Sequence, residues 1–398
     1  MAATLKLGDK IWATQEGSLL AYNSENNNYK PLPFDFTRAS SATRVNKQGL
    51  IETVASGVPR IDYTDANGAL LLEPQRTNLV TYSIPISSSP YSYDGVGVGT
   101  APIVTTNQGI SQDGTQNATR IDFNLNGGTT SSDLSQMAYV GTSLIGDYTS
   151  SFYLKSFDNN SYTVTLLDTN GAATTETITP EWKRFTFYNG GGTTSANLIR
   201  IRLRGNENTS DTASLLAWGF QLEQSSYPTS YIPTQGSAVT RIADACSGAG
   251  NDQVINSEEG VLYAEISALA NPTSQEVALS VSEGQTGANR LLIRLKTNGA
   301  IGIVLRVANT TEATIDSGVL NQLANHKVAV KWKVNDIALW IDGVEVGTDN
   351  LANVFPVNTL NEVSFNQGNN SNPFYGNCKD LRVYNTALTD AELIALTT

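Results

Sequence analysis

The stretch HKVAVKWKVNDIALWIDGVEVG, residues 326–347, decides the fold class that the sequence predicts. Along its first half, apolar residues alternate with lysines, which places Val328, Val330, Trp332 and Val334 on one side. A period of two is typical of a strand with one buried face in an antiparallel sheet. A second apolar run, Ile337 to Ile341, ends at Asp342-Gly343, which favours a tight hairpin turn. The stretch therefore predicts three consecutive antiparallel strands.

The composition of the whole chain supports the same fold class. Its 398 residues include 33 Gly and 16 Tyr, and only 16% of them are charged. This suits short strands joined by turns better than helices, which favour Ala, Leu, Glu and Lys. At roughly 100–200 residues per domain, the length allows two or three domains. We expect an all-β protein, with an N-terminal segment of small β-hairpins followed by two antiparallel β-sandwich, or jelly-roll, domains.

Changes of texture along the chain predict four parts. These are an N-terminal segment of residues 1–80, a sandwich of residues 81–235, a linker of residues 236–256 and a second sandwich of residues 257–398. Apolar runs bounded by turn residues predict strands at Ile51–Val54, Ala69–Leu72, Tyr162–Leu167, Arg290–Leu295 and Ala300–Val307. Near the C-terminus, Thr389 and Glu392 are spaced as a capping box, which predicts one short terminal helix.

Two features of the first sandwich are open to more than one interpretation. In the strand Leu198–Leu203, isoleucines alternate with Arg200, Arg202 and Arg204. These arginines form either a solvated sheet face or a surface for an acidic partner, and we favour the solvated face. Trp182 and Trp218 could stack on sugar rings, but each lies inside an apolar strand pattern, which favours core packing.

Charge and apolar run lengths exclude several classes of partner. The chain carries 25 basic and 37 acidic residues, a net charge of −12. Because nucleic-acid affinity comes largely from Lys and Arg, we expect no nucleic-acid partner. No run reaches the ~18 apolar residues of a membrane helix and no secretion signal opens the chain, so we expect no membrane contact and synthesis in a cytosol. The two cysteines, Cys246 and Cys378, are expected to be free thiols.

The residues give little support for catalysis. A glycosidase needs two carboxylates flanking the scissile bond, and the E-x-D-x-x-E spacing that supplies them on one strand of some β-sandwich hydrolases does not occur. With a single histidine, His326, a Ser/His/Asp site or a metal site built on His and Cys is not expected. We therefore expect no catalytic residues, no cofactor and no metal site, with a structural Ca²⁺ at a sandwich edge as a remaining possibility.

Binding of sugars needs only ring faces and amide groups on loops. The loop NQGNNSNPFYG, residues 366–376, supplies five candidates: Asn369, Asn370, Asn372, Phe374 and Tyr375. A second candidate set, Tyr91, Tyr93 and Asp94, lies in the sequence SSPYSYDG. The alternative interpretation of both is an ordinary polar loop.

Three stretches resemble known families. HKVAVKWKVNDIALWIDGVEVG and then FYGNCKDLRVYNTALTDAELIAL, in residues 257–398, resemble laminin-G-like and concanavalin A-like lectin domains, which implies a two-sheet sandwich. EWKRFTF and AWGFQLEQSSYPTSYIPT resemble jelly-roll carbohydrate-binding modules. Residues 36–83, with FTRASSATRVNKQGLIE, GVPRIDY and GALLLEPQRTNLV in this order, resemble a segment of tail-fibre and other virion appendage proteins of bacterial viruses.

The third resemblance implies a non-enzymatic tail or head fibre that is assembled in the host cytoplasm and located in the virion. It implies a homotrimer that contacts other virion proteins through its N-terminal segment and binds host cell-surface glycans with its sandwiches. We expect the arginines of that segment, Arg38, Arg44, Arg60 and Arg76, to be buried against acidic or carbonyl partners at a subunit contact. The alternatives are a purely structural virion protein without sugar binding and a polysaccharide-degrading tail spike.

Overall fold

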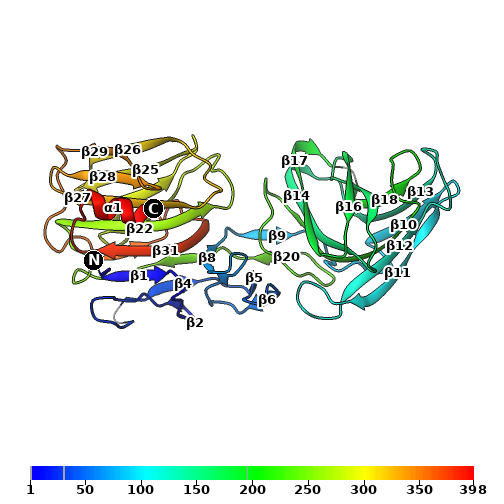
Figure 1. Ribbon diagram of the computed structural model, residues 1–398, viewed down its shortest axis with the longest axis horizontal. Helices are drawn as coiled ribbons and strands as arrows, with labels where there is room; N and C mark the ends of the chain where they lie inside the picture. The colour runs from blue at the N-terminus through cyan, green and yellow to red at the C-terminus, as the bar shows by residue number, and fades with distance from the viewer. Residues whose placement is uncertain (1, 30–31, 195) are drawn as a thin grey trace. The chain divides into compact units, whose positions relative to one another are not determined.

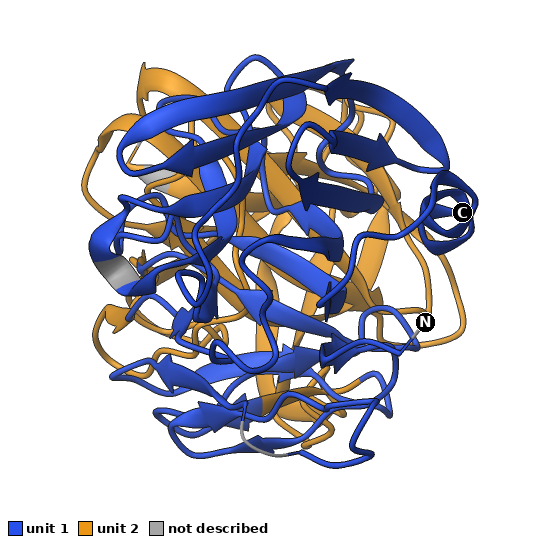
Figure 2. Cartoon of the chain, turned by 90° about the vertical axis from the view of Figure 1, so that its left-hand side faces the viewer, with its two compact units in different colours: residues 1–49, 53–75, 242–398 blue, residues 50–52, 76–241 orange. Residues whose placement is uncertain are grey.

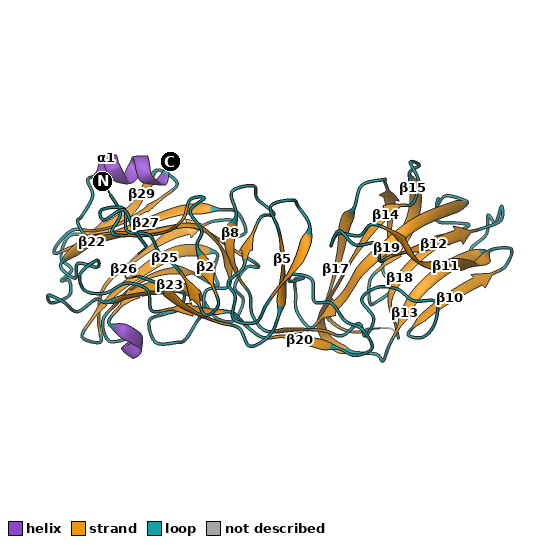
Figure 3. Ribbon diagram, turned by 90° about the horizontal axis from the view of Figure 1, so that it is seen from below, coloured by secondary structure: helices purple, strands orange, loops and turns teal. Residues whose placement is uncertain are grey.

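The computed structural model describes residues 2–29, 32–194 and 196–398. The chain forms two compact units, of which unit 1 comprises residues 1–49, 53–75 and 242–398 and unit 2 comprises residues 50–52 and 76–241 (Figure 2). Strands dominate both units (Figure 3). In the described ranges the one α-helix is α1 (Asp390–Thr397), and a short 3-10 helix, η1, lies at Gly284–Thr286. The prediction of an all-β protein is confirmed. Within those ranges no helix has the length and hydrophobicity needed to cross a membrane.

Unit 1 is a sandwich of two antiparallel sheets. The eight-stranded sheet has the order β29-β28-β27-β22-β31-β8-β7, with β1 also paired to β31. Its strands are β1 (Leu5–Gly8), β7 (Ile61–Asp62), β8 (Ala69–Leu72), β22 (Glu259–Ala268), β27 (His326–Lys333), β28 (Ile337–Ile341), β29 (Val344–Asp349) and β31 (Gly376–Tyr384). The stretch 326–347 therefore forms three consecutive antiparallel strands, as predicted.

The five-stranded sheet of unit 1 has the order β26-β25-β24-β23-β30. Its strands are β23 (Val277–Ser282), β24 (Arg290–Leu295), β25 (Ala300–Val307), β26 (Thr310–Val319) and β30 (Glu362–Ser364), and a 3-10 turn, η1 (Gly284–Thr286), precedes β24. Apolar side chains from both sheets form one core, which contains Leu262, Val330, Trp332, Ile293 and Leu305. On β27, Val328, Val330 and Trp332 face this core, as the alternation predicts. The opposite face is not simply surface, because Ala329 packs in a second cluster with Leu393 of α1 and Lys331 is buried. Val334, which the pattern placed with the core residues, is 51% exposed.

Most of residues 1–80 belong to unit 1, and residues 50–52 and 76–80 belong to unit 2, so these residues do not form a separate N-terminal part. β1 pairs with Asp380–Val383 of β31, and β8 pairs with Gly376–Cys378 of the same strand (Figure 1). A further sheet, β2-β3-β4-β21, joins β2 (Thr14–Gln15), β3 (Ser18–Leu19), β4 (Phe34–Thr37) and β21 (Ala245–Ser247). Because Leu5, Phe34 and Leu70 lie in the core of the sandwich, this boundary differs from the expected one at residue 80.

Unit 2 is a second sandwich of two five-stranded antiparallel sheets. One has the order β10-β13-β18-β15-β16, with β10 (Tyr91–Val96), β13 (Leu134–Val140), β15 (Tyr162–Leu167), β16 (Ala173–Ile178) and β18 (Asn197–Arg204). The other has the order β11-β12-β19-β14-β17, with β11 (Thr100–Gly109), β12 (Ala118–Asn124), β14 (Ile145–Ser156), β17 (Lys183–Thr193) and β19 (Thr212–Glu223). Ile201 and Leu203 from the first sheet pack with Phe152 and Phe220 from the second.

The expected linker, residues 236–256, takes part in sheets of both units. β20 (Val239–Arg241) pairs with β9 (Arg76–Asn78), and β21 pairs with β4. The remaining strands, β5 (Ala42–Val45) and β6 (Ile51–Val54), are joined by a turn in which the amide of Gly49 donates to the carbonyl of Asn46 over 2.9 Å. Unit 2 is thus an insertion between two parts of unit 1.

Candidate functional site

The outer face of the five-stranded sheet is the surface of unit 1 on which the candidate loop lies. Leu279 and Val281 on β23, and Leu291 and Ile293 on β24, point into the core. Since side chains alternate along a strand, the residues between them point outward. These outward residues include Ser280, Ser282, Arg290 and Arg294, and on β25 they include Arg306, which precedes the exposed turn at Ala308.

Residues 366–373, which we call the 366–373 loop, cross the outer face of β23. The Arg290 Nη1 donates to the carbonyl oxygen of Gln367 over 2.7 Å, and Ala278 forms a parallel bridge with Pro373. Gly368 has φ of 70°, and a Cβ there would stand 2.9 Å from the Ser282 Cβ. Only glycine allows this approach without strain. The loop is therefore held against the sheet at both of its ends.

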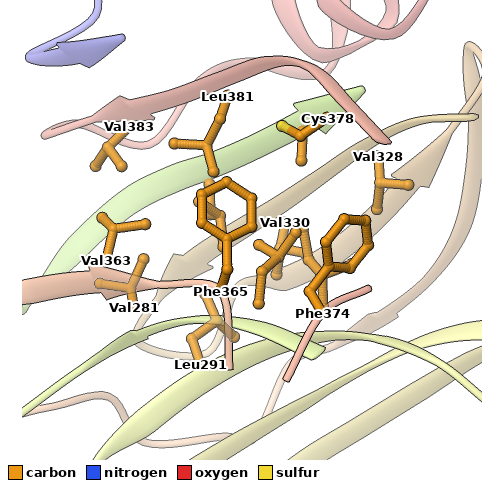
Figure 4. Close-up of a cluster of buried hydrophobic side chains, with 14 of the residues drawn as sticks. Val281, Leu291, Val328, Val330, Val363, Phe365, Phe374, Cys378, Leu381 and Val383 are labelled. Carbon is orange, nitrogen blue, oxygen red and sulfur yellow. The ribbon is translucent and has the colours of Figure 1, made fainter. Parts of the chain in front are cut away.

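Phe374 is not a sugar-stacking residue, which corrects its assignment as a candidate. It is 1% exposed, and its ring lies 5.9 Å from the ring of Phe365, in the core. Figure 4 shows both rings among Val330, Cys378 and Leu381, between the sheets. The amide of Phe374 donates to the carbonyl of Phe365 over 2.9 Å, which directs the side chain inward. Phe374 anchors the end of the 366–373 loop.

The other candidates of this loop differ in their surroundings. Asn369 is exposed, and its Oδ1 accepts a hydrogen bond from the Ser371 amide at 3.1 Å. Asn370 and Asn372 have φ of 59° and 47°, a region that asparagine tolerates better than most residues. The backbone conformation of the turn therefore explains why asparagine occurs at positions 370 and 372. Tyr375 is half-buried next to Phe374.

Arg290, which was not among the candidates, lies close to Asn369, and Arg306 is its partner on the next strand. A Cβ at Gly287 would stand 3.1 Å from the Asn369 Cβ and 3.3 Å from the Arg290 Nη1, so the three residues are neighbours. Arg306 is directly opposite Arg290 in the β24–β25 ladder. Burial, and then the positive charges of Arg306 and Arg294, lower the pKa of Arg290. The site therefore has an excess of positive charge and of hydrogen-bond donors.

Of the second candidate set, Tyr91 is not accessible to a ligand. Tyr91 is buried in the core of unit 2, 5.3 Å from the ring of Tyr139, and this burial raises its pKa well above the ordinary value. Its hydroxyl donates to the Tyr82 carbonyl over 2.6 Å, and the Tyr93 hydroxyl donates to the Ile86 carbonyl over 2.6 Å. Asp94 is exposed. The prediction that Tyr91 offers its ring to a ligand is wrong, because that ring packs inside the sandwich.

The predictions for the two tryptophans and for the arginine face of unit 2 are correct only in part. Trp218 is fully buried, as predicted. Trp182 is only half-buried, with its indole N–H donating to the Ile110 carbonyl over 3.1 Å and the Lys155 Nζ 5.8 Å from its ring. Arg202 is buried and its Nε donates to Glu207 over 2.9 Å, so the arginine face is not uniformly solvated.

The arginines of the N-terminal segment divide into two pairs. Arg38 and Arg60 are buried inside unit 1, where Arg38 Nη1 lies 3.1 Å from Asp244 and Arg60 Nη1 lies 2.6 Å from Glu73. Burial alone would lower the pKa of Arg60, but the charges of Glu73 and Asp244 raise it. These two arginines stabilise the chain from inside, which corrects their expected place at a subunit contact.

Arg44 and Arg76 are half-buried, and an assembly role for them stays a prediction. Arg76 belongs to unit 2, where its Nη2 lies 3.2 Å from the Ser225 hydroxyl and its guanidinium lies 5.3 Å from the centre of the Tyr227 ring.

His326 contacts hydrogen-bond partners from its own chain, which indicates a structural role. Its Nδ1 lies 2.6 Å from the Asp342 Oδ2, and its Nε2 lies 3.0 Å from the Asn321 carbonyl, so both ring nitrogens are occupied at the start of β27. In the parts of the chain that the structure describes, no group of three or more His, Cys, Asp or Glu side chains is arranged to hold a metal ion. Both cysteines are buried free thiols.

Residues 251–394 match the family model of the concanavalin A-like lectin/glucanases superfamily. This part of unit 1 is thus similar to that superfamily. A comparison with curated proteins finds no match.

Several solved structures resemble the chain. The carbohydrate-binding module CBM40 of the Ruminococcus gnavus IT-sialidase, bound to α2,3-sialyllactose, is 24% identical, with 38% of this chain and 94% of that chain covered and a TM-score of 0.32. Domain 4 of the Geobacillus stearothermophilus arabinanase AbnA, with arabinotriose, is 15% identical over 42% and 81% of the two chains, with a TM-score of 0.31. Domains LG4-5 of the mouse laminin α1 chain are 10% identical over 77% and 94%, with a TM-score of 0.26.

Proposed function

We propose that this chain is a non-enzymatic, glycan-binding subunit of a bacterial virus particle, a tail or head fibre that attaches to host surface glycans. The glycan part depends on one observation, the position of Asn369 close to Arg290, whose ladder partner is Arg306, on the outer face of a concanavalin A-like sandwich. The amide and the two guanidiniums donate hydrogen bonds, and the hydroxyl and ring oxygens of a saccharide accept them.

The virion part is supported by the order of sequence elements in residues 36–83. In this proposal Arg44 and Arg76, which are half-buried, contribute to contacts with other virion proteins or with further copies of the chain in a homotrimer. Detection of the chain by mass spectrometry in purified virus particles tests the location. Light scattering tests the trimer, and a monomeric mass for the full chain would argue against it.

A glycan array probed with the full chain tests binding. We expect retention on a subset of bacterial surface glycans, and a loss of that retention in Asn369→Ala. The matched control is Asn325→Ala, which removes an exposed asparagine from the loop before β27. If the wild-type chain binds no glycan at high protein concentration, the purely structural alternative replaces this proposal.

The tail-spike alternative makes a separate prediction. A polysaccharide-degrading spike would release reducing ends from host capsule or surface polysaccharide, whereas a binding subunit leaves the polymer intact. Release of reducing ends by the purified chain would therefore overturn the non-enzymatic part of the proposal.

A further inference from the structure

Resting on the proposed glycan binding, we infer that the glycan is acidic and that Arg290 and Arg306 together bind its anionic group, a carboxylate or a sulfate. The two arginines are opposite partners on β24 and β25, and both side chains leave the outer face of the five-stranded sheet. Directly opposite residues in such a ladder have Cβ atoms about 4.5–5.5 Å apart.

These two positive charges lack a carboxylate partner. Among the residues that the structure describes, no Asp or Glu oxygen lies within 4.0 Å of either guanidinium. Like charges directly opposite each other in a ladder destabilise a sheet. In a chain with 37 acidic and 25 basic residues, a pair of arginines without a neighbouring carboxylate indicates that a ligand supplies the negative charge.

The next outward arginine on the same strand shows the contrast. Arg294 lies 3.0 Å from Glu276 and 3.5 Å from Asp316, and the side chain of Lys296 also pairs with Asp316. One end of the outer face is thus neutralised by the chain's own carboxylates. The other end, at Arg290 and Arg306, keeps its charge, so the charge excess is local to the 366–373 loop.

The geometry suits a small anion on a sugar. Arg290 is 7% exposed and is fixed by its bond to the Gln367 carbonyl, whereas Arg306 is half-exposed and accessible from solvent. Planar guanidinium groups match the two oxygens of a carboxylate or sulfate. The neighbouring Asn369 amide can then donate to a hydroxyl of the same sugar.

The charge of the whole chain argues against a dense polyanion such as a nucleic acid as the ligand. A net charge of −12 repels such a polymer, while a saccharide with one anionic group per few sugars needs only a local positive site.

An array that holds neutral, carboxylated and sulfated versions of the same glycans tests the inference with the full chain. We expect binding to the acidic members, weakened by salt, and a loss of about tenfold to a hundredfold in Arg306→Gln, as expected when a hydrogen-bonded charge is removed. Lys333→Gln is the matched control, because it removes the same charge from the same domain on β27, where Lys333 pairs with Glu259 at 2.9 Å.

A second readout separates loss of a ligand contact from loss of folding. Because Arg306→Gln removes a like-charge pair, its unfolding midpoint without ligand is expected to equal or exceed that of the wild type. A lowered midpoint would mean that Arg306 stabilises the fold, and would count against the inference.

The possible array results have distinct meanings. Equal binding of neutral and acidic members, unchanged in Arg306→Gln, would leave glycan binding standing and overturn the acidic specificity. Absence of binding to every member would overturn glycan binding itself. Preference for sulfated over carboxylated members, or the reverse, would support the inference and identify the anion.

Discussion

Asp244 and Arg60 form a buried ion pair that links positions 184 residues apart in the sequence. Asp244 also accepts a hydrogen bond from Arg38 at 3.1 Å and one from the Glu73 amide at 2.8 Å. A single carboxylate thus fixes the N-terminal segment to the stretch that begins the second part of unit 1.

Asp244→Asn should destabilise unit 1 strongly. The change removes the charged carboxylate that the buried Arg38 and Arg60 both contact, and breaking a buried pair costs about 3–5 kcal/mol of unfolding free energy. Denaturant unfolding measures the loss. The matched control is Asp65→Asn, which breaks an exposed pair with Lys379 and should cost less than about 1 kcal/mol. Equal effects of the two substitutions would contradict the structural role of Asp244.

Phe374→Ala should lower the unfolding free energy of unit 1 by about 3–5 kcal/mol, because it leaves a cavity in the core beside Phe365. Asn369→Ala, in the same loop but exposed, should change stability by no more than about 0.5 kcal/mol. Thermal unfolding of both variants makes the comparison. A small effect of Phe374→Ala would argue for a surface position of the ring.

The acid stability of unit 2 should depend on Asp133. Its carboxylate accepts hydrogen bonds from the Thr130 and Val98 amides at 2.8 and 3.1 Å, which lower its pKa below the ordinary value. For a carboxyl group whose folded pKa is lowered, the stabilisation is complete above the unfolded pKa, about 3.9, and is lost as pH falls through the folded pKa.

Unfolding measured from about pH 6 to about pH 2 should therefore show a steeper acid loss in the wild type than in Asp133→Asn. Parallel curves for the two proteins would show that Asp133 has the same pKa in the folded and unfolded states.

Thr389→Ala should weaken the start of α1. The Thr389 hydroxyl accepts a hydrogen bond from the Glu392 amide, and the Glu392 carboxylate accepts one from the Thr389 amide at 2.9 Å, which completes a capping box. Loss of such a cap costs about 1 kcal/mol. Hydrogen exchange of the α1 amides should accelerate in Thr389→Ala and stay unchanged in Thr389→Ser, which keeps the hydroxyl. Equal exchange in all three proteins would show that the cap is dispensable.

Local patterns were enough to predict many elements of this chain. The strands Tyr162–Leu167, Arg290–Leu295, Ala300–Val307 and Ile337–Ile341 have the predicted bounds, and so does the capping box at Thr389. In each case the signal lies within a few residues, because alternation and turn residues determine a strand. β11 gave no such signal, since most residues of this edge strand are exposed.

The candidate site was harder to predict because it depends on pairing across the sheet. The sequence shows Arg290 and Arg306 on separate strands, and only the register of the hairpin around Asn298-Gly299 makes them opposite partners. The 366–373 loop was found by its asparagines and aromatic residues. However, the composition of the loop did not reveal that Phe374 is a core residue, because the inward direction of its side chain depends on a backbone hydrogen bond to Phe365.

The pairing of β1 with β31 affects the order in which the two units can fold during synthesis. Leu5 is synthesised long before its partner Val383, because unit 2 and most of unit 1 lie between them in the sequence. Unit 2 is complete at residue 241, so it can finish folding while the first strands of unit 1 still expose an unpaired edge. A chain truncated before Gly376 would contain a folded unit 2 and an incomplete eight-stranded sheet in unit 1. The unpaired strands of that sheet would be exposed to proteases and to pairing with other chains.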